Sequence, residues 1–579
     1  MLRNQIRHKD RRRTAGRHAV APSAILAFLC VVSIGRSYGQ TDTIETNVPA
    51  LKAVFANDFT IGCLLSYPHV GFPDDPPVPG QSPVVAPHGG DLIRFHMNSM
   101  SPGNNMKPQY TVDISSSAAA YASASPGAAR DSVNVHPVVR FNGNLIAQLN
   151  WAKRQGFTFR GHTLVWHSQT PGTAFFRSGY TDGGTRLSKA QMTERMRNYI
   201  RGIIRLLHEN WPGLVSAMDV VNEAVNDDGT DRTGSEWYTT FGDNSYILKA
   251  FELTRQATAE YSETQMKLYY NDYNTSNPAK ADGIVRTCGP IFRAGYLDGI
   301  GIQEHDALNS PTAAQWIASY TKFDTICTEM SVTELDVNPG GSPTPAVLAT
   351  QANQYGMLFK CFVERSFRAG RGKIVNVSKD GLNDQYAFVA NASLWDMYNK
   401  CKPAFFAVVN VGTYYNALDS LIIYAGALQE GNFTPESWVT FSASLALAEA
   451  ARDQNYSSTV SADTALSVAF VSLEAAINEL VIVSVADEVG HLEAYTLSQN
   501  YPNPFNPTTQ IRYSVPQTSL ISLKVYTLLG EEVATLFIGN REAGQYEATF
   551  NGAEVPSGIY LVRMSAGSFS ETRKMILLK

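Results

Sequence analysis

The sequence predicts an α/β protein whose largest domain is a (β/α)8 TIM barrel, followed by a small three-helix module and a C-terminal β-sandwich. Eight β-rich runs alternate with helical patterns over residues 45–412, which is typical of βα units in a parallel sheet. Helical apolar stripes then occupy residues 415–483, and short alternating strands with frequent turn residues occupy residues 499–579. Eight runs fit a closed barrel better than an open sheet.

The composition indicates a folded protein of several domains. The 579 residues are 44% hydrophobic and carry a net charge of -5, so large cores can form and neither nucleic acid nor a membrane surface is an expected partner. The six cysteines show no CxxC or Cys/His spacing, which argues against a structural zinc site. In an exported protein, Cys361 and Cys401 form one candidate disulfide, and Cys288 and Cys327 form another.

The N-terminus has the pattern of a secretory signal peptide. Residues 1–18 are basic, and the apolar run Ala19–Ile34 that follows is short compared with the roughly 20 residues of a membrane span. Small residues precede an expected cleavage near Gly39, which gives a mature chain beginning at Gln40. We therefore assign residues 1–39 to the signal peptide and expect no stable membrane insertion.

The expected barrel strands share apolar or β-branched sequences, and they comprise Phe59–Ser66, Leu92–Ser99, Thr158–Trp166, Val215–Asn222, Lys267–Asn271, Gly299–His305, Ile326–Leu335 and Lys373–Ser378. Between them, the helical spacing of Met192, Met196, Tyr199, Ile203 and Leu206 predicts a helix face packed on the sheet. Two other stretches are predicted as surface loops: Pro68–Gly90 is rich in proline and glycine, and Ser115–Ala129 is rich in serine and alanine.

Two of the expected strands deliver a glutamate to the same end of the barrel. The run Val215–Asn222 is followed directly by Glu223, and Glu334 lies 111 positions later, near the end of another β-rich run. Barrels of this kind hold their catalytic groups at the carboxyl ends of the strands. Two carboxylates facing one cleft are the arrangement that cleaves a glycosidic bond by a general acid and a nucleophile.

Several motifs at successive strand ends resemble those of glycoside hydrolase family 10, the retaining endo-β-1,4-xylanases, over roughly residues 50–410. The matching motifs are Arg160–Gln169, Val220–Ala224, Tyr270–Asn274, Asp298–His305, Thr333–Asp336 and Lys402–Ala404. The resemblance implies a secreted enzyme that hydrolyses internal bonds of xylan or xylo-oligosaccharides by double displacement. Two-carboxylate chemistry of this kind requires no cofactor and no metal ion.

The resemblance also implies a role for each catalytic residue. Glu223 is the general acid/base and Glu334 the nucleophile, while His305 orients Glu334 and Asp336 supports His305. Both glutamates start from a pKa of about 4.3. The chemistry requires the acid's pKa to rise towards the working pH and the nucleophile to stay ionised, so the two carboxyls need different surroundings.

A second set of residues is implied to bind the sugar chain. Asn222 is expected to contact the 2-hydroxyl at the cleavage point, and the other members of the set line the neighbouring subsites: Asn104, Lys107, His162, Trp166, Gln169, Tyr273 and Gln303.

Three positions depart from the family pattern. Gly103 stands where the family usually has a glutamate, and Asp380 and Phe388 stand where it has tryptophans. Losing tryptophan removes area on which sugar rings stack. Substrate choice is therefore open between linear xylan, a decorated xylan or shorter oligosaccharide, and another β-linked glycan. A non-catalytic carbohydrate-binding surface protein is a further alternative, although both glutamates are present.

The C-terminal part predicts export to the cell surface. Residues 415–483 resemble the small helical FIVAR modules, and residues 484–498 have the composition of a linker. The opening Asn500–Pro507 and the closing Lys574–Lys579 resemble the C-terminal sorting domain of type IX secretion cargo. The resemblance implies that residues 499–579 engage the type IX secretion machinery and that the protein is secreted or displayed on the cell surface.

Overall fold

A computed structural model describes residues 44–65, 89–385, 387–456, 461–482, 494–527 and 530–578. The expected signal peptide, nearly all of the Pro68–Gly90 loop and most of the expected linker lie outside these residues. The chain forms two compact units, each described here by itself. The first comprises the described residues up to Gly426 together with Ser444–Ala475, and the second comprises Ala427–Ala443 and the described residues from Ala476 onwards.

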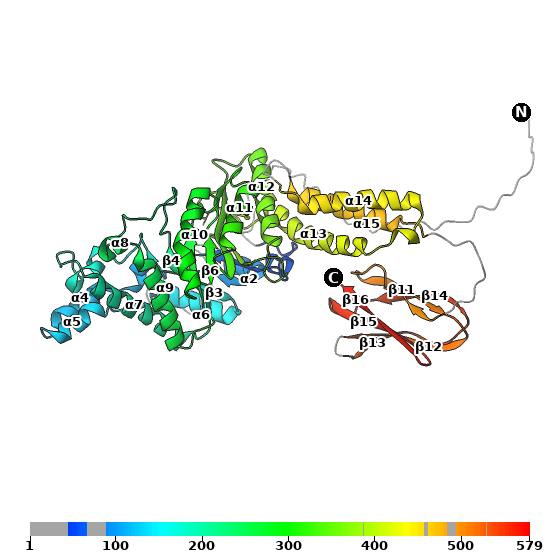
Figure 1. The fold of residues 1–579 in the computed structure, drawn as a ribbon, viewed down its shortest axis with the longest axis horizontal. Helices are drawn as coiled ribbons and strands as arrows, with labels where there is room; N and C mark the ends of the chain where they lie inside the picture. Colours follow the sequence, from blue (N-terminus) through cyan, green and yellow to red (C-terminus); the bar gives the residue numbers. More distant parts are fainter. Residues whose placement is uncertain are drawn as a thin grey trace, which may run out of the picture. The chain divides into compact units, whose positions relative to one another are not determined.

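The first unit contains the predicted (β/α)8 barrel (Figure 1). Its eight parallel strands pair in the order β1-β9-β8-β6-β5-β4-β3-β2, and a parallel bridge between Leu64 and Ser101 joins the two ends of this series. A short strand, β7 (His305–Ala307), extends the pairing of β8. The barrel strands are β1 (Thr60–Leu64), β2 (Ser99–Met100), β3 (Thr158–Trp166), β4 (Val215–Asn222), β5 (Lys267–Asp272), β6 (Gly299–Ile302), β8 (Glu329–Asn338) and β9 (Ile374–Asp380).

Helices surround this sheet and connect its strands. The long helix α7 (Lys189–Asn210) begins with a capping box formed by Ser188 and Gln191. It buries the predicted apolar face except at Leu206, where the neighbouring Leu207 is buried instead. The other helices of this region are α1 (Leu51–Val54), α2 (Gly89–His96), α3 (Pro108–Thr111), α4 (Ile114–Ser123), α5 (Ala128–Val135), α6 (Gly143–Gln155), α8 (Glu236–Phe241), α9 (Ser245–Glu260), α10 (Pro278–Arg293), α11 (Ala313–Phe323) and α12 (Pro345–Val363), with 3-10 turns at Thr173–Phe176 and Ser178–Tyr180.

Two predictions of local structure were wrong. Leu92–Ser99 is not a strand: Leu92, Ile93 and His96 are buried at helical spacing in α2, and only Ser99 belongs to a strand. Ser115–Ala129 is not a loop, because most of it lies in α4 and α5. The carboxylate of Asp113 caps α4 by accepting a hydrogen bond from the Ser116 amide at 3.0 Å, and the alanines favour helix.

The two candidate disulfides are not formed. The cysteines in the described part of the chain are all free: Cys63, Cys288, Cys327, Cys361 and Cys401. Burial raises the pKa of the Cys63 and Cys361 thiols to about 12, so these side chains pack as small apolar groups.

Three long helices follow the last barrel strand: α13 (Pro403–Gly426), α14 (Pro435–Asp453) and α15 (Ala462–Asn478). Helix α13 runs unbroken through the boundary expected between residues 412 and 415. Within the first unit it contacts both of the others, through Asp419 with Arg452 of α14 and through Asn410 with Asp463 of α15. No helix in the described part of the chain is both long and apolar enough to cross a membrane.

The second unit contains the predicted β-sandwich. One sheet has the order β10-β11-β14, and the other has the order β13-β12-β15-β16. Leu497, Tyr513, Val525, Val562 and Leu577 are among the side chains that form a common core. The strands are β10 (Thr496–Leu497), β11 (Thr508–Val515), β12 (Ser519–Thr527), β13 (Glu532–Arg541), β14 (Gly544–Asn551), β15 (Gly558–Ala566) and β16 (Phe569–Leu577), of which β10 lies within the stretch expected to be a linker.

Candidate active site

Glu223 lies directly after β4, at the carboxyl end of the barrel strands. Its backbone has a φ of 54°, and its amide donates to the Asn271 carbonyl at 2.9 Å. Three neutral donors hold the carboxylate: Asn222 and Gln303 donate to Oε1 at 3.1 and 3.0 Å, and the Trp166 indole donates to Oε2 at 2.9 Å. The carboxylate therefore has a fixed orientation in a polar pocket.

Glu334, on β8, has cations among its neighbours. The Asn271 amide donates to Oε1 at 3.2 Å, and His305 Nε2 lies 3.5 Å from Oε2. Burial alone would raise the pKa of Glu334, but hydrogen bonding by His305 and the electrostatic influence of His162 and Arg160 lower it well below the usual range. Glu334 is consequently an anion at any pH near neutrality, as a nucleophile requires.

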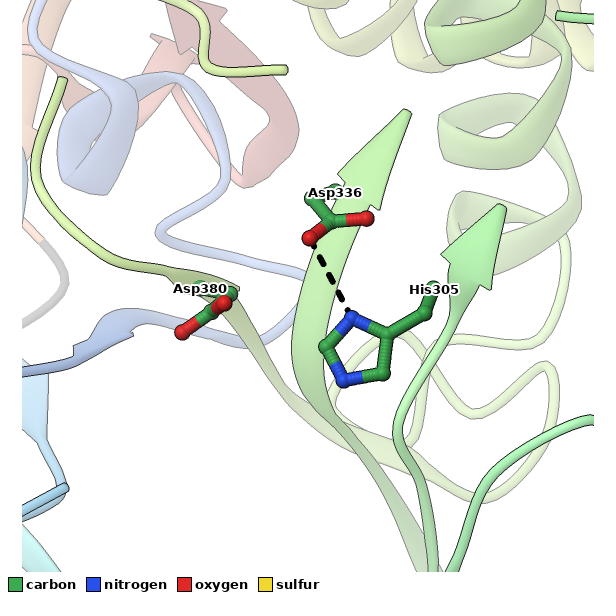
Figure 2. A group of neighbouring side chains, drawn as sticks. All are labelled: His305, Asp336 and Asp380. Atoms are coloured by element: carbon green, nitrogen blue, oxygen red, sulfur yellow. Dashed lines mark hydrogen bonds and ion pairs between the residues drawn. The ribbon is translucent and has the colours of Figure 1, made fainter. Parts of the chain in front are cut away.

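His305 lies between two carboxylates, as shown for one of them in Figure 2. Its Nδ1 is 3.2 Å from Asp336 Oδ2, and its Nε2 faces Glu334. Burial opposes protonation of the imidazole, but the hydrogen bonds with Asp336 and Glu334 outweigh it and raise the pKa of His305 to about 11. The side chain is thus an imidazolium that joins the two acids.

Asp380 ends β9 and is the third group in Figure 2. It is only 7% exposed. Burial and the nearby Glu334 raise the pKa of its carboxyl to about 7. Potential ligand atoms of His305, Asp336 and Asp380 lie within 4.8 Å of one another. Both ring nitrogens of His305 already face carboxylates, so we interpret this cluster as an acid–imidazolium network and assign no metal ion to it.

A second group of side chains meets beside Trp166. Lys107 Nζ donates to Asn104 at 2.7 Å and to Gln169 at 2.8 Å, and it lies 4.5 Å from the centre of the Trp166 ring. The His162 ring is 6.4 Å from the same indole. The polar groups and the aromatic ring together can bind sugar hydroxyls and the apolar face of a sugar.

A buried acid–base layer beneath these residues was not predicted from the sequence. Asp219, inside β4, is fully buried and contacts Arg160, and its Oδ2 lies 2.8 Å from His162 Nδ1. A lone carboxylate within the apolar run of β4 was the available signal, because a buried charge needs a partner.

Asn271 and Arg232 were also missed as site residues. Asn271 Nδ2 donates to Asn222 as well as to Glu334, which links the two strands that carry the glutamates. Arg232 Nε donates to the Glu223 carbonyl at 2.7 Å, and its Nη2 donates to the Tyr273 hydroxyl at 3.1 Å. The strand-end motif contains Asn271, but nothing in the sequence singles out Arg232.

The structure brings the predicted site residues into one connected cluster. Glu223, Glu334, His305, Asp336, Asn222, Gln303 and Trp166 are joined by the contacts above, and Asn104, Lys107, Gln169, His162 and Tyr273 surround them. Their individual roles in catalysis and binding stay predictions.

The structure shows the surroundings of Gly103 and Phe388, two of the positions that depart from the family pattern. Gly103 has a φ of 58°, so a glutamate there would be strained. Phe388 is 80% exposed, and its ring centre lies 5.7 Å from that of His305. An aromatic face is therefore still present beside His305.

Comparison with known proteins agrees with this geometry. Residues 77–411 match glycosyl hydrolase family 10, and residues 499–578 match the secretion system C-terminal sorting domain. Endo-1,4-beta-xylanase Y of Acetivibrio thermocellus is 30% identical over 397 residues, which are 65% of this chain and 33% of that protein. A putative endo-1,4-beta-xylanase of Caldicellulosiruptor saccharolyticus is 32% identical over 326 residues, 54% of this chain and 98% of that protein.

A solved structure of a xylanase is also similar. The CBM22-1 and GH10 modules of Clostridium thermocellum endo-1,4-beta-D-xylanase 10B, complexed with xylohexaose, match with a TM-score of 0.53 and 29% identity, covering 64% of this chain and 69% of that one. This chain spans only about a third of the length of the Acetivibrio relative. The family match covers more than half of the chain and agrees with the barrel and its paired glutamates. The chain belongs to glycosyl hydrolase family 10.

Proposed function

We propose that this protein is a retaining endo-β-1,4-xylanase that hydrolyses internal xylosidic bonds of xylan. The observation that carries the proposal is the pair of glutamates: Glu223 directly follows β4 and is held by neutral donors, and Glu334 lies within β8 beside an imidazolium. The xylanase names of the family relatives support the choice of substrate. No metal ion or cofactor enters the mechanism.

In the first step, Glu223 gives its proton to the glycosidic oxygen while Glu334 attacks C1 of the sugar. The bond between C1 and the leaving oxygen breaks, and an ester between C1 and Glu334 forms. In the second step, Glu223 takes a proton from water, the water oxygen attacks C1, and the ester bond breaks. Two inversions at C1 give net retention, which requires the two carboxyls to stand about 5 to 5.5 Å apart.

His305 and Asp336 support this sequence without touching the leaving group. The imidazolium keeps Glu334 anionic before attack and stabilises the carboxylate again when the ester breaks. Asp336 holds the ring through Nδ1, which fixes the direction of Nε2 towards Glu334.

Binding of the chain is assigned to the residues around this pair. Asn222 is assigned to the 2-hydroxyl at the cleavage point, as the family resemblance implies, and its side chain lies beside the Glu223 carboxylate. The remaining subsite contacts come from Asn104, Lys107, His162, Trp166, Gln169, Tyr273 and Gln303, which surround the glutamates.

The C-terminal sorting domain points to export, with the protein secreted or held at the cell surface. We assign residues 499–579 to recognition by the type IX secretion machinery and residues 1–39 to a signal peptide that precedes it. Residues 415–483 are assigned as a FIVAR-like spacer between the barrel and residues 484–498, the linker to the sorting domain.

The experiment that tests the function is product analysis with purified protein on linear xylan, arabinoxylan and mixed-linkage β-glucan. We expect short xylo-oligosaccharides with retained anomeric configuration, and loss of turnover in Glu334→Ala with an unchanged circular dichroism spectrum. Cleavage of β-glucan alone would favour another retaining glycanase. Binding to xylan without any cleavage would favour a non-catalytic carbohydrate-binding protein.

A further inference from the structure

We propose that Lys280 is a positioning residue for sugar binding, which holds the Tyr273 ring in place beside the Glu223 loop without touching the substrate itself. Lys280 lies in the first turn of helix α10, and Tyr273 is one of the residues assigned to the sugar chain. This inference rests on the proposed function, because it concerns how the same site holds the chain.

Lys280 is enclosed by protein, and two acids balance its charge. The side chain is 0% exposed, so the ammonium group cannot reach a substrate. Its Nζ lies 2.9 Å from Asp272 Oδ1 and 3.0 Å from Asp227 Oδ1. A buried cation needs such partners, because its removal from water costs free energy. The two carboxylates therefore fix the position of the ammonium group.

The two acids belong to loops that follow neighbouring strands of the barrel. Asp227 lies shortly after Glu223, in the segment that follows β4. Asp272 is the last residue of β5 and directly precedes Tyr273. Strands β4 and β5 are paired. Lys280 thus ties the segment that follows the proposed acid/base to the segment that carries the tyrosine.

The same ammonium group lies against one face of the Tyr273 ring. Nζ of Lys280 is 3.4 Å from the ring centre, well within the roughly 6 Å reach of a cation–π interaction, which is strongest when the cation is desolvated. The hydroxyl of Tyr273 accepts a hydrogen bond from Arg232, whose Nε donates to the Glu223 carbonyl. The ring is therefore held at its face by Lys280 and at its hydroxyl by Arg232.

This arrangement leaves part of the Tyr273 ring available to a ligand. The residue is half-buried, and the face that Lys280 covers is closed, so the open part comprises the opposite face and the edge. An aromatic ring that is already fixed binds with a smaller loss of conformational entropy than one that must be ordered. Without Lys280, only the contact at the hydroxyl would hold the ring. Lys280 should therefore contribute to affinity and not to the chemical step.

The test measures kcat and KM on xylohexaose for the full chain and for Lys280→Met, Tyr273→Ala and the double variant. Methionine keeps most of the length of lysine and removes its charge. We expect Tyr273→Ala to raise KM by about 10-fold, the scale on which truncating an aromatic contact weakens binding. Lys280→Met should also raise KM, with kcat nearly unchanged in both variants. The double variant should have the KM of Tyr273→Ala alone, because Lys280 acts through the ring.

Lys360→Met is the matched control. Lys360 is also buried, pairs with Glu364 and lies 5.3 Å from the centre of the Tyr456 ring, but it belongs to α12. Losing this lysine should lower stability and leave both KM and kcat unchanged. If Lys280→Met fails to fold, as judged by circular dichroism, Lys280→Met combined with Asp272→Asn decides, with Asp272→Asn alone as its reference.

The outcomes separate this inference from the proposed function. An unchanged KM in Lys280→Met, with xylohexaose cleaved by the unchanged enzyme, would overturn the role of Lys280 and leave the xylanase function standing. So would a fall in kcat at constant KM, or increases in KM that multiply in the double variant. Failure of the unchanged enzyme to cleave xylohexaose would overturn the proposed function and this inference with it.

Discussion

Replacing His305 with glutamine removes the cation next to the nucleophile while keeping a hydrogen-bond donor of similar reach. Nε2 of His305 lies 3.5 Å from Glu334 Oε2, where two unit charges attract by roughly 5 kcal/mol at an effective dielectric constant of about 20. An opposite charge at such a distance lowers a carboxyl pKa by about one to three pH units. We expect the acidic limb of the kcat/KM profile to move to higher pH by that amount in His305→Gln.

The assay is the pH dependence of kcat/KM on p-nitrophenyl β-xylobioside, measured under conditions where the protein stays folded. In the unchanged enzyme, the depressed pKa of Glu334 keeps the nucleophile ionised below the ordinary carboxyl range. His208→Gln is the matched control, because His208 is also paired with an acid, Glu263, but lies on α7 away from the site. An acidic limb at the same pH in His305→Gln and the unchanged enzyme would refute the reasoning.

Three further predictions concern stability and metal dependence. His305 has a folded-state pKa near 11, above its unfolded value, so its contribution to the free energy of unfolding should be complete below about pH 6.5 and disappear as the pH rises towards 11. This contribution is measured by denaturant unfolding of the unchanged protein and of His305→Gln at pH 6 and pH 10. An equal difference in the free energy of unfolding at both pH values would contradict the prediction. Arg160→Met leaves the buried Asp219 without the guanidinium that it contacts and should lower the free energy of unfolding by about 3 to 5 kcal/mol. Arg205→Met, which removes an ion pair on the surface, should lower it by less than about 1 kcal/mol. Equal losses of unfolding free energy in the two variants, measured in urea, would contradict the prediction. Dialysis against EDTA should leave xylan hydrolysis unchanged, because the chemistry uses carboxylates alone; activity that is lost and then restored by a divalent cation would show that a metal ion takes part.

The barrel could be predicted because alternation of strand and helix is a property of the whole chain, visible even when single elements are ambiguous. Leu92–Ser99 shows that ambiguity: a short apolar run fits a buried strand and a buried helix equally well, and the structure places most of it in α2. The prediction of a loop at Ser115–Ala129 was wrong for a related reason. Serine favours loops and caps whereas alanine favours helix, and the cap supplied by Asp113 decides for helix.

Those site residues that belong to successive barrel strands could be predicted from the sequence. Glu223 directly follows β4, Glu334 lies in the second half of β8, and His305 begins β7 just after β6. All three therefore lie towards the carboxyl ends of the barrel strands, and their proximity follows from the barrel itself. Arg232 reaches Glu223 from a later turn, and no periodicity encodes that contact.

The difference between the two glutamates arises from what surrounds them and not from the strands that carry them. Both follow apolar β-runs, and both accept a hydrogen bond from a neutral amide. Only Glu334 has His305 beside it, and His305 is cationic because Asp336 holds its other nitrogen. Asp336→Asn should therefore weaken the nucleophile without touching it, through loss of the imidazolium. In Asp336→Asn, the acidic limb of the kcat/KM profile should move to higher pH, as in His305→Gln. The double variant should show little further shift, because both changes act through the charge of His305.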